Sequence, residues 1–471
     1  MTDIALDAAA PPRKTFFGHP VGLWWLAFCE FWERFSFYGM QNLLALYLTG
    51  LLLLPGHIEK IIGSGGLRAT LEAIYGAHTP VSMSAGIIGM YTSFVYVTPI
   101  VGGWIADRFT GRTVAVTIGA LTMAAGHFLM AFEESFLLAV GCMLVGVGFF
   151  KGNIASQIGD LYDKGDPRRD DAYQIFTLSV QVAVVVSPLV CGTLGEKVAF
   201  HWGFGAAGVG MLTGLVVYLL ARPTLPHERP RAVARREARA PLTPAEKRSV
   251  AVLVLMIPIL ATAMVGNQEF FVAYVLWAKG NLQLTFGAFE MPATWLFAIA
   301  AVLSSGSILL SMAFWRWWGK RWKEPDELMK MGCGALVAAC GPLVLAAASA
   351  VVASTGHKVG IVWSLAYEII ADLGFANLFP IGIALYSRVA PKALTGVMVG
   401  VYFLHLAAAN LFVGRLGGML EHMSGAQFWE MHSGIVAIAG VLLIVVRQAF
   451  GRELAREDEF VPAAPALSQA T

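Results

Sequence analysis

Apolar runs of about 20 residues recur along the whole chain and constrain its fold more than any other feature. The hydrocarbon core of a bilayer is about 30 Å thick, so a helix rising 1.5 Å per residue needs roughly 20 apolar residues to cross it. Because backbone groups in lipid must be hydrogen-bonded within their own segment, we expect every such run to be a helix. The runs lie at residues 20–48, 81–105, 113–132, 136–157, 172–192, 203–221, 249–275, 292–315, 331–353, 360–387, 394–418 and 427–447.

The composition agrees with a protein whose outer surface faces lipid. Hydrophobic residues make up 57% of the chain and charged residues only 14%, whereas a soluble domain needs a charged surface. The five cysteines have no paired spacing, which argues against a disulfide framework or a metal site. A net charge of +2 gives no indication of a nucleic-acid partner.

A polar connection rich in Arg and Pro divides the twelve runs into six and six. Two six-helix bundles on either side of such a loop are a common transporter layout. We therefore predict a cytoplasmic tail, a bundle, a basic linker, a second bundle and a second tail. Their predicted bounds are 1–19, 20–221, 222–248, 249–448 and 449–471.

Basic residues predict the orientation of the chain in the membrane. Most Lys and Arg lie in one alternate set of loops, in the linker and in the tails, which the positive-inside rule places in the cytoplasm. The first 19 residues are polar, and the following apolar run is longer than a signal peptide. We expect a multi-pass protein of the cytoplasmic (inner) membrane with both termini in the cytoplasm.

Charged residues inside the apolar runs indicate where function lies. Glu30, Glu33 and Arg34 fall within about a hundred degrees of one another on a helix and so share one face. Placing one charge at the bilayer centre costs roughly 2.5–3.5 kcal/mol, so this face must meet a cavity or a partner. Lys151 in the fourth run is the expected partner, because two acids and two bases form a neutral cluster.

This charged cluster allows two interpretations. It could be a static salt bridge between the first and fourth helices. Intramembrane ionisable groups, however, usually mark ion or substrate paths. If a substrate anion draws Lys151 away, one carboxylate should take up a proton. We therefore predict proton coupling, with the proton as the coupling ion and no cofactor, at Glu30, Glu33, Arg34 and Lys151.

The loop after the second run is a glycine-rich turn with opposite charges. Residues 102–112 include Asp107, Arg108 and Arg112. Ion pairs at such a helix junction could hold a bundle closed and break when it opens, which predicts a cytoplasmic gate. The loop also suits a simple positive-inside anchor.

Two segments carry a family resemblance. Residues 30–35 read Glu-x-x-Glu-Arg-Phe and residues 37–39 read Phe-Tyr-Gly, which resembles the ExxERFxYYG signature of the proton-dependent oligopeptide transporter family. The loop at 103–112 resembles the cytoplasmic signature of the major facilitator superfamily. The resemblance covers most of residues 20–220 and is thinner beyond them. It implies an all-α major facilitator fold of 12 transmembrane helices, alternating access, and inward proton-coupled uptake of di- and tripeptides.

The resemblance also implies site residues, position by position. The family's coupling and substrate-contact positions fall on Glu30, Glu33, Arg34, Tyr38 and Lys151, and its second-helix tyrosines on Tyr91 and Tyr96. Other positions carry different side chains: the first-helix arginine falls on Gln41, the fifth-helix asparagine on Gln181, an eighth-helix glutamine on Phe297, the tenth-helix glutamate on Phe375, and the eleventh-helix tryptophan on Tyr402. The seventh-helix acid falls on Gln268, with Glu269 one residue away.

These differences affect one end of a peptide zwitterion more than the other. The chain keeps the cations Arg34 and Lys151 but lacks the aligned acid that would receive a peptide amino terminus. Glu269, Glu368 or Asp372 could restore a negative pole from other helical positions. Alternatively, Glu368 and Asp372 pair with neighbouring helices or line the entrance.

Two functions remain. The first is a proton-coupled symporter for short peptides or peptide-like molecules. The second is a proton-coupled transporter of a non-peptide, anionic small molecule, because the retained pole is positive. A membrane-embedded enzyme or receptor is disfavoured, since no loop contains a nucleophile–base pair, metal-ligand spacing or a phosphate-binding glycine loop. We expect a monomer in a lipid bilayer with a small-molecule substrate and no nucleic-acid partner.

Overall fold

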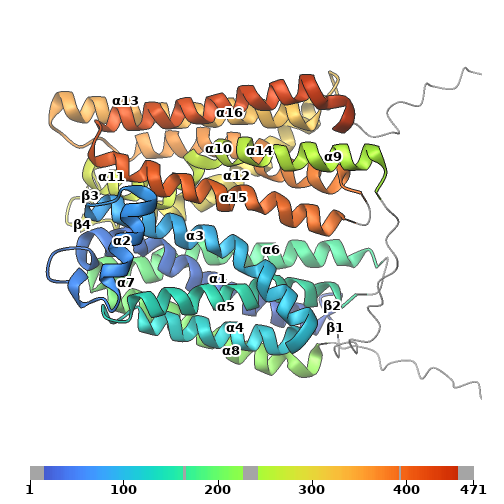
Figure 1. The fold of residues 1–471 in the computed structure, drawn as a ribbon, viewed down its shortest axis with the longest axis horizontal. Coiled ribbons are helices and arrows are strands. Elements are labelled where there is room, and N and C mark those ends of the chain that lie inside the picture. The colour runs from blue at the N-terminus through green and yellow to red at the C-terminus, as the bar shows by residue number, and fades with distance from the viewer. Residues whose placement is uncertain (1–14, 163–165, 226–241, 392–393, 455–471) are drawn as a thin grey trace, which may run out of the picture. The chain divides into compact units, whose positions relative to one another are not determined.

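The computed structural model describes residues 15–162, 166–225, 242–391 and 394–454, most of which are helical (Figure 1). Two short antiparallel hairpins interrupt the helices within this described part. They pair β1 (Thr15–Phe16) with β2 (His19–Pro20) and β3 (Thr285–Phe286) with β4 (Phe289–Glu290). Much of the predicted linker, at 226–241, and most of both predicted tails lie outside the described residues.

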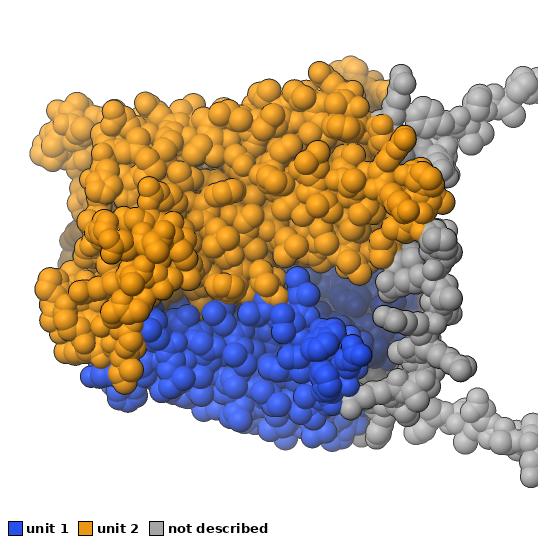
Figure 2. Space-filling view, viewed as in Figure 1, with its two compact units in different colours: residues 1–40, 98–233 blue, residues 41–97, 234–471 orange. Residues whose placement is uncertain are grey.

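The chain divides into two compact units (Figure 2). The first unit contains residues 1–40 and 98–233, and the second contains residues 41–97 and 234–471. Both boundaries within the first hundred residues fall inside long helices, α1 (Val21–Tyr47) and α3 (Pro80–Ile105). The domain bounds predicted from the sequence remain a prediction.

The remaining elements follow in chain order within each unit. In the first unit they are η3 (Ala106–Thr110), α4 (Arg112–Leu129), α5 (Phe136–Gly159), α6 (Arg168–Ser187), η4 (Pro188–Gly192), α7 (Thr193–Lys197), α8 (Phe200–Ala221) and η5 (Arg222–Thr224). In the second unit they are η1 (Leu48–Leu52), η2 (Ile58–Lys60), α2 (Ser64–Tyr75), α9 (Pro244–Leu255), α10 (Ile257–Gln268), η7 (Glu269–Phe271), α11 (Ala273–Asn281), α12 (Trp295–Gly319), α13 (Glu327–Thr355), α14 (Val362–Val389), α15 (Thr395–Leu416), η8 (Gly417–Glu421) and α16 (Gly425–Leu454).

Each of the twelve apolar runs coincides with a long helical stretch, which confirms the predicted all-α membrane fold. Among the described residues, 11 stretches are long and apolar enough to cross a membrane. The twelfth stretch is α1, the first run. It is 27 residues long, but its three ionisable side chains make it too polar to count as a membrane span by composition alone. The fifth run is longer than predicted, Arg168–Lys197 instead of 172–192, because Pro188 begins a wide helical turn that continues the helix.

Glycines allow close helix packing in the first unit. A Cβ atom on Gly102 of α3 would lie 2.0 Å from the carbonyl oxygen of Gly148 on α5. A Cβ atom on Gly119 of α4 would lie 2.8 Å from the carbonyl oxygen of Gly146, also on α5. Small residues of this kind let membrane helices approach until their backbones touch. The contacts fix α5, and with it Lys151, which follows Gly148 by three residues.

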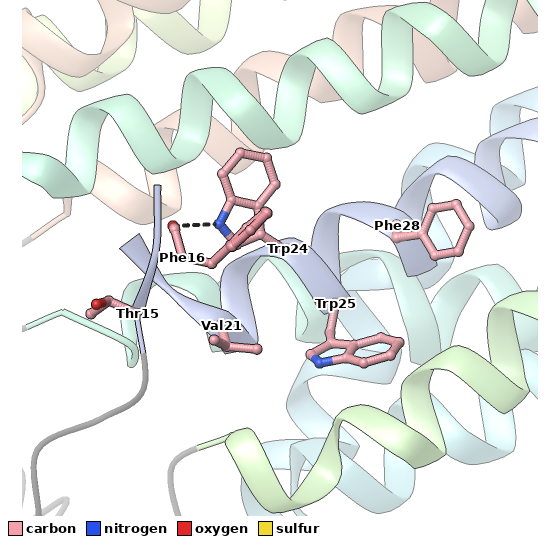
Figure 3. Close-up of a pocket in the computed structure, with 6 residues that line it drawn as sticks. All are labelled: Thr15, Phe16, Val21, Trp24, Trp25 and Phe28. Carbon is pink, nitrogen blue, oxygen red and sulfur yellow. Dashed lines mark hydrogen bonds between the residues drawn. The ribbon is translucent and has the colours of Figure 1, made fainter. Parts of the chain in front are cut away.

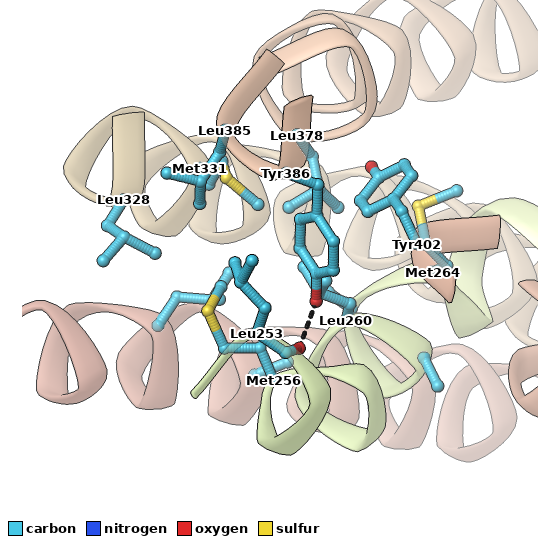
Figure 4. Close-up of a cluster of buried hydrophobic side chains, with 14 of the residues drawn as sticks. Leu253, Met256, Leu260, Met264, Leu328, Met331, Leu378, Leu385, Tyr386 and Tyr402 are labelled. Carbon is cyan, nitrogen blue, oxygen red and sulfur yellow. Dashed lines mark hydrogen bonds between the residues drawn. The ribbon is translucent and has the colours of Figure 1, made fainter. Parts of the chain in front are cut away.

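The second unit has a buried apolar core between α9, α10, α13, α14, α15 and α16 (Figure 4). Leu253 and Met256 lie below Leu385 and Tyr386 in this view. The Tyr386 hydroxyl donates to the carbonyl oxygen of Leu253, so the one polar group of that side chain is satisfied inside the core. This packing positions α14, the helix that carries the acids considered below.

Candidate functional site

Three charged side chains of α1 form a single cluster inside the first unit. Arg34 donates from Nη2 to Glu33 Oε1 at 2.8 Å and from Nε to the other oxygen of the same carboxylate. Arg34 Nε also lies 3.2 Å from Glu30 Oε1, one helical turn away. All three residues are at most 5% exposed. The structure therefore brings together the three residues that the helical spacing placed on one face.

Lys151 completes the charge of this cluster. Arg34 between two carboxylates leaves one negative charge in excess, which is costly in a buried site. Lys151 is half-buried on α5, close enough for its charge to act on Glu30, Glu33 and Arg34. Glu30 Oε2 has no hydrogen-bond partner in the part of the chain described. The cluster thus has a carboxylate oxygen able to accept a further hydrogen bond or a proton.

Two aromatic side chains one turn further along α1 contact the guanidinium group. The Arg34 Cζ atom lies 5.3 Å from the centre of the Phe37 ring, a cation–π contact. The Tyr38 hydroxyl also interacts with Arg34. A substrate carboxylate that binds the Arg34 guanidinium would compete with Glu33 for its N–H donors.

Four other predicted residues are divided between the two units. Gln181 lies half-buried on α6 in the first unit. In the second unit, Gln41 Nε2 donates to Thr92 Oγ1 at 3.3 Å, one residue beyond the buried Tyr91. Tyr96 packs against the apolar core of the second unit. Their predicted contacts with substrate remain predictions.

The two candidates for the seventh-helix acid point toward different helices, because adjacent helical residues differ by about 100°. Gln268 accepts a hydrogen bond from Asn410 Nδ2 of α15 at 3.0 Å. Glu269 is fully buried, and its Oε2 lies 3.5 Å from His432 Nε2 of α16. His432 donates from Nδ1 to the carbonyl oxygen of Phe428 at 2.8 Å. His432 was not among the predicted residues; a histidine inside the apolar run 427–447 was the available signal.

Aromatic packing occupies three predicted substrate positions in the second unit. Phe297 lies parallel to Phe271, with ring centres 5.7 Å apart. Phe375 stacks on Phe379 at 5.2 Å. The Tyr402 hydroxyl donates to the Phe379 carbonyl oxygen at 2.9 Å. These three positions present apolar surfaces. At Phe297 the family resemblance implies a glutamine, and at Phe375 it implies a glutamate.

Glu368 and Asp372 lie one turn apart on α14 and are about 95% buried. Glu368 faces the Tyr274 hydroxyl of α11, and Asp372 faces the Ser304 hydroxyl of α12. Each carboxylate still has one oxygen, Glu368 Oε1 or Asp372 Oδ2, without a hydrogen-bond partner among the described residues. Both acids therefore contact neighbouring helices and keep capacity for another donor.

Two of the three predicted gate residues, Asp107 and Arg112, form an ion-pair chain with Asp160 in the first unit. Arg112 Nη1 lies 2.7 Å from Asp160 Oδ2 at the end of α5, and Arg112 Nε lies 3.7 Å from Asp107 Oδ1. The Arg108 guanidinium lies 5.7 Å from the Trp104 ring centre. Asp160 was not among the predicted residues; its only signal was an acid at the end of an apolar run. The arrangement links η3 to the end of α5.

A separate hollow of about 620 Å³ lies at the start of α1 (Figure 3). The Trp24 indole donates to the carbonyl oxygen of Phe16 at 2.9 Å there. The hollow is lined by Thr15, Phe16, Val21, Trp24, Trp25 and Phe28. It contains no ionisable side chain and none of the predicted site residues, so tryptophans at the end of a membrane span are a sufficient explanation.

Comparisons with known proteins show which transporters this chain resembles. The Major Facilitator Superfamily model matches residues 23–414. An uncharacterized transporter of Bacillus subtilis (strain 168) is 26% identical over 94% of this chain and 96% of its own. A di-/tripeptide transporter of Lactococcus lactis subsp. cremoris is 25% identical over 93% of this chain and 97% of its own. A crystal structure of a POT peptide transporter in complex with sulfate has a TM-score of 0.76 at 26% identity, covering 94% of this chain and 97% of that one.

The chain therefore belongs to the major facilitator superfamily of membrane transporters. Within that superfamily, the matches over nearly the whole length confirm the resemblance to the proton-dependent oligopeptide transporter family. They also decide against the membrane-embedded enzyme or receptor that the sequence had left as a remote alternative.

Proposed function

We propose that this protein is a proton-coupled symporter that imports short peptides or peptide-like molecules by alternating access. The buried Glu30–Glu33–Arg34 cluster with Lys151 nearby is the observation that carries the proposal. The chain's similarity to a di-/tripeptide transporter and to a POT peptide transporter supports the substrate class. The protein would act as a monomer in the cytoplasmic membrane, with both termini in the cytoplasm, without a cofactor and with the proton as the coupling ion.

Coupling follows from charge balance within the cluster. Without substrate, the two cations balance the two carboxylates. A substrate carboxylate that binds Arg34 or Lys151 neutralises one of the two cations. One protein carboxylate then lacks a cation, and an uncompensated charge of this kind is strongly disfavoured in a buried site. Glu30 or Glu33 then binds a proton, because protonation removes the uncompensated charge. Release of the substrate restores the cations to their carboxylates and expels the proton.

The negative pole for a peptide amino terminus would come from Glu368 and Asp372. Both are buried on one face of α14, and each keeps one carboxylate oxygen without a partner in the described chain. An ammonium group could donate to these two oxygens. This arrangement would replace the acid that the family has at Phe375.

Gradient-driven uptake in reconstituted vesicles tests the coupling. Glu33→Gln and Lys151→Ala should each abolish accumulation of labelled dialanine under an inward proton gradient. Glu33→Gln should keep measurable counterflow exchange, because exchange needs binding and conformational change but no net proton movement. Glu59→Gln is the matched control, since Glu59 pairs with Arg68 at 2.8 Å at an exposed site. Unchanged gradient-driven uptake in both cluster variants would leave only a static salt bridge.

A non-peptide anion is the second candidate substrate. The aromatic packing of Phe297 and Phe375 favours it, because these positions offer no partner for an ammonium group. Uptake of dialanine and of N-acetyl-alanine separates the two candidates. If a peptide amino terminus binds Glu368 and Asp372, the double variant E368Q/D372N should raise KM for dialanine and leave the acetylated compound unaffected. Uptake of small organic anions without any dipeptide uptake would establish the second candidate.

A further inference from the structure

An aromatic cluster lies at the end of α12, where the chain turns toward α13. Both helices are apolar spans, Trp295–Gly319 and Glu327–Thr355, so the turn between them lies near the depth of the lipid headgroups. The ring centres of Trp318 and Trp322 are 4.8 Å apart, and those of Trp317 and Trp322 are 5.4 Å apart. Phe314 and Trp315 extend the cluster along α12. Trp317 and Trp322 are about half exposed.

Four cations share this stretch with the rings. They are exposed, and they are Arg316, Lys320, Arg321 and Lys323. The Arg321 guanidinium lies 4.7 Å from the centre of the Trp317 ring. Trp318 donates from its indole nitrogen to the carbonyl oxygen of Lys323 at 3.3 Å. The rings of Trp317 and Trp318 therefore contact the basic turn directly.

The neighbouring acids are already bound by other bases. Glu324 forms an ion pair with Lys330, and Glu327 lies 2.8 Å from Arg388.

Asp326 lies 2.5 Å from Arg447 and also caps α13 by accepting a hydrogen bond from the Met329 backbone. Within the described ranges, no carboxylate forms an ion pair with any of the four cations. The turn therefore carries four uncompensated positive charges beside exposed indoles.

We propose that this turn, residues 314–323, binds the headgroup of an anionic phospholipid. Arg and Lys donate to phosphate oxygens, and the guanidinium can do so with two parallel hydrogen bonds. Indole rings sit at the boundary between headgroups and acyl chains, with the apolar body toward the chains. Basic clusters next to a membrane span attract anionic lipids. A zwitterionic headgroup brings its own cation, so the same four charges attract it less.

The turn is attached to α14 through Asn377. Trp315 Nε1 donates to Asn377 Oδ1 at 2.5 Å, and Ser311 donates to the same oxygen at 3.0 Å. These contacts join α12 to the helix that carries Glu368 and Asp372. A bound lipid would therefore rest on a fixed surface and could stabilise the α12–α14 contact. The proposal is independent of the transported substrate.

Tryptophan quenching tests the site with the full-length protein. Vesicles of one composition, phosphatidylcholine with a minor fraction of phosphatidylglycerol, carry bromine on the acyl chains of one lipid or of the other. The wild-type protein should be quenched more by brominated phosphatidylglycerol than by an equal amount of brominated phosphatidylcholine. The excess should disappear in W317F/W322F, which identifies the tryptophans that report it.

Two double variants separate a site from general charge attraction. K320Q/R321Q should weaken phosphatidylglycerol binding about thirtyfold, since each cation at an anionic surface contributes about fivefold. R316Q/K323Q should act in the same direction and guards against a folding defect in the first variant. K247Q/R248Q, which removes two exposed adjacent cations at the start of α9, should leave the excess quenching unchanged.

Three results would overturn the proposal. Equal quenching by the two brominated lipids would show no preference for the anionic headgroup. An equal loss in K247Q/R248Q and K320Q/R321Q would show attraction by basic charge in general. Suppression of the excess by millimolar inorganic phosphate at constant ionic strength would identify a site for the free ion instead of the lipid.

Discussion

The crossing of α3 and α5 offers a sharp test of the packing that positions Lys151. Gly102→Ala places a Cβ atom 2.0 Å from the carbonyl oxygen of Gly148 and 2.3 Å from the carbonyl carbon of the same residue. The next residue, Gly103, has no heavy atom within 4 Å of an added Cβ. Gly103→Ala is therefore a matched control: the same chemical change in the same helix, one residue away, without the contact.

The structure sets the size of the expected difference. Both substitutions gain up to about 1 kcal/mol of helix propensity, so this contribution cancels between them. Real Cβ atoms essentially never come within 3.0 Å of another heavy atom, and the new Cβ would lie 2.0 Å from the carbonyl oxygen. Gly102→Ala must therefore move the two backbones apart by at least about 1 Å. Overpacking of this kind costs about 1–3 kcal/mol, and no side-chain rotation relieves a contact with backbone. We expect Gly102→Ala to be about 3 kcal/mol less stable than Gly103→Ala.

Unfolding in detergent measures this difference, and uptake measures its consequence. Lys151 lies one turn beyond Gly148, so displacing α5 should also move Lys151 away from the α1 carboxylates. Gly102→Ala should therefore lose gradient-driven uptake as well as stability, while Gly103→Ala keeps its stability. Equal unfolding free energies for the two variants, within about 0.5 kcal/mol, would show that the helices do not meet at Gly102 in the membrane.

Contacts outside the α1 cluster give three further predictions. Arg112→Gln removes the exposed pair with Asp160, which is worth at most about 1 kcal/mol, so the uptake rate should change while the melting temperature barely moves. A hydrogen bond from Arg168 lowers the pKa of Asp166. The ionised Asp166 therefore stabilises the folded protein at pH values above the usual pKa of aspartate, and this stabilisation is lost as the pH falls through the lowered pKa. Thermal unfolding from pH 6 to pH 3 should show this loss in the wild type and a flatter profile in Asp166→Asn. Tyr386→Phe leaves a buried α9 carbonyl without its donor and should cost about 1 kcal/mol in the same assay; a loss above about 3 kcal/mol would contradict the contact.

The α1 cluster shows how far sequence reasoning reaches. Helical spacing alone placed Glu30, Glu33 and Arg34 on one face, because residues one and three or four positions apart have a fixed angular relation. It could not show that Arg34 forms ion pairs with both carboxylates. Nor could it find His432 beside Glu269, because that pair is 163 residues apart in the chain and depends on how α16 packs.

The acids of the second unit mark the same limit. Glu368 and Asp372 were expected either to restore a negative pole or to pair with neighbouring helices, and both lie buried on α14. Their contacts with Tyr274 and Ser304, however, follow from the packing of α14 against α11 and α12. A position aligned with a family glutamate, Phe375, proved to be part of an aromatic stack.

By itself, the sequence determined the number and approximate bounds of the membrane helices, because burial in lipid is a local requirement on each segment's length and polarity. It also determined which helices carry charges that need partners. The tertiary structure alone decided which partners those are. Close packing selects one set of helix contacts, such as Gly102 against Gly148, from many that the apolar surfaces would allow equally well, and those contacts decide which distant side chains meet.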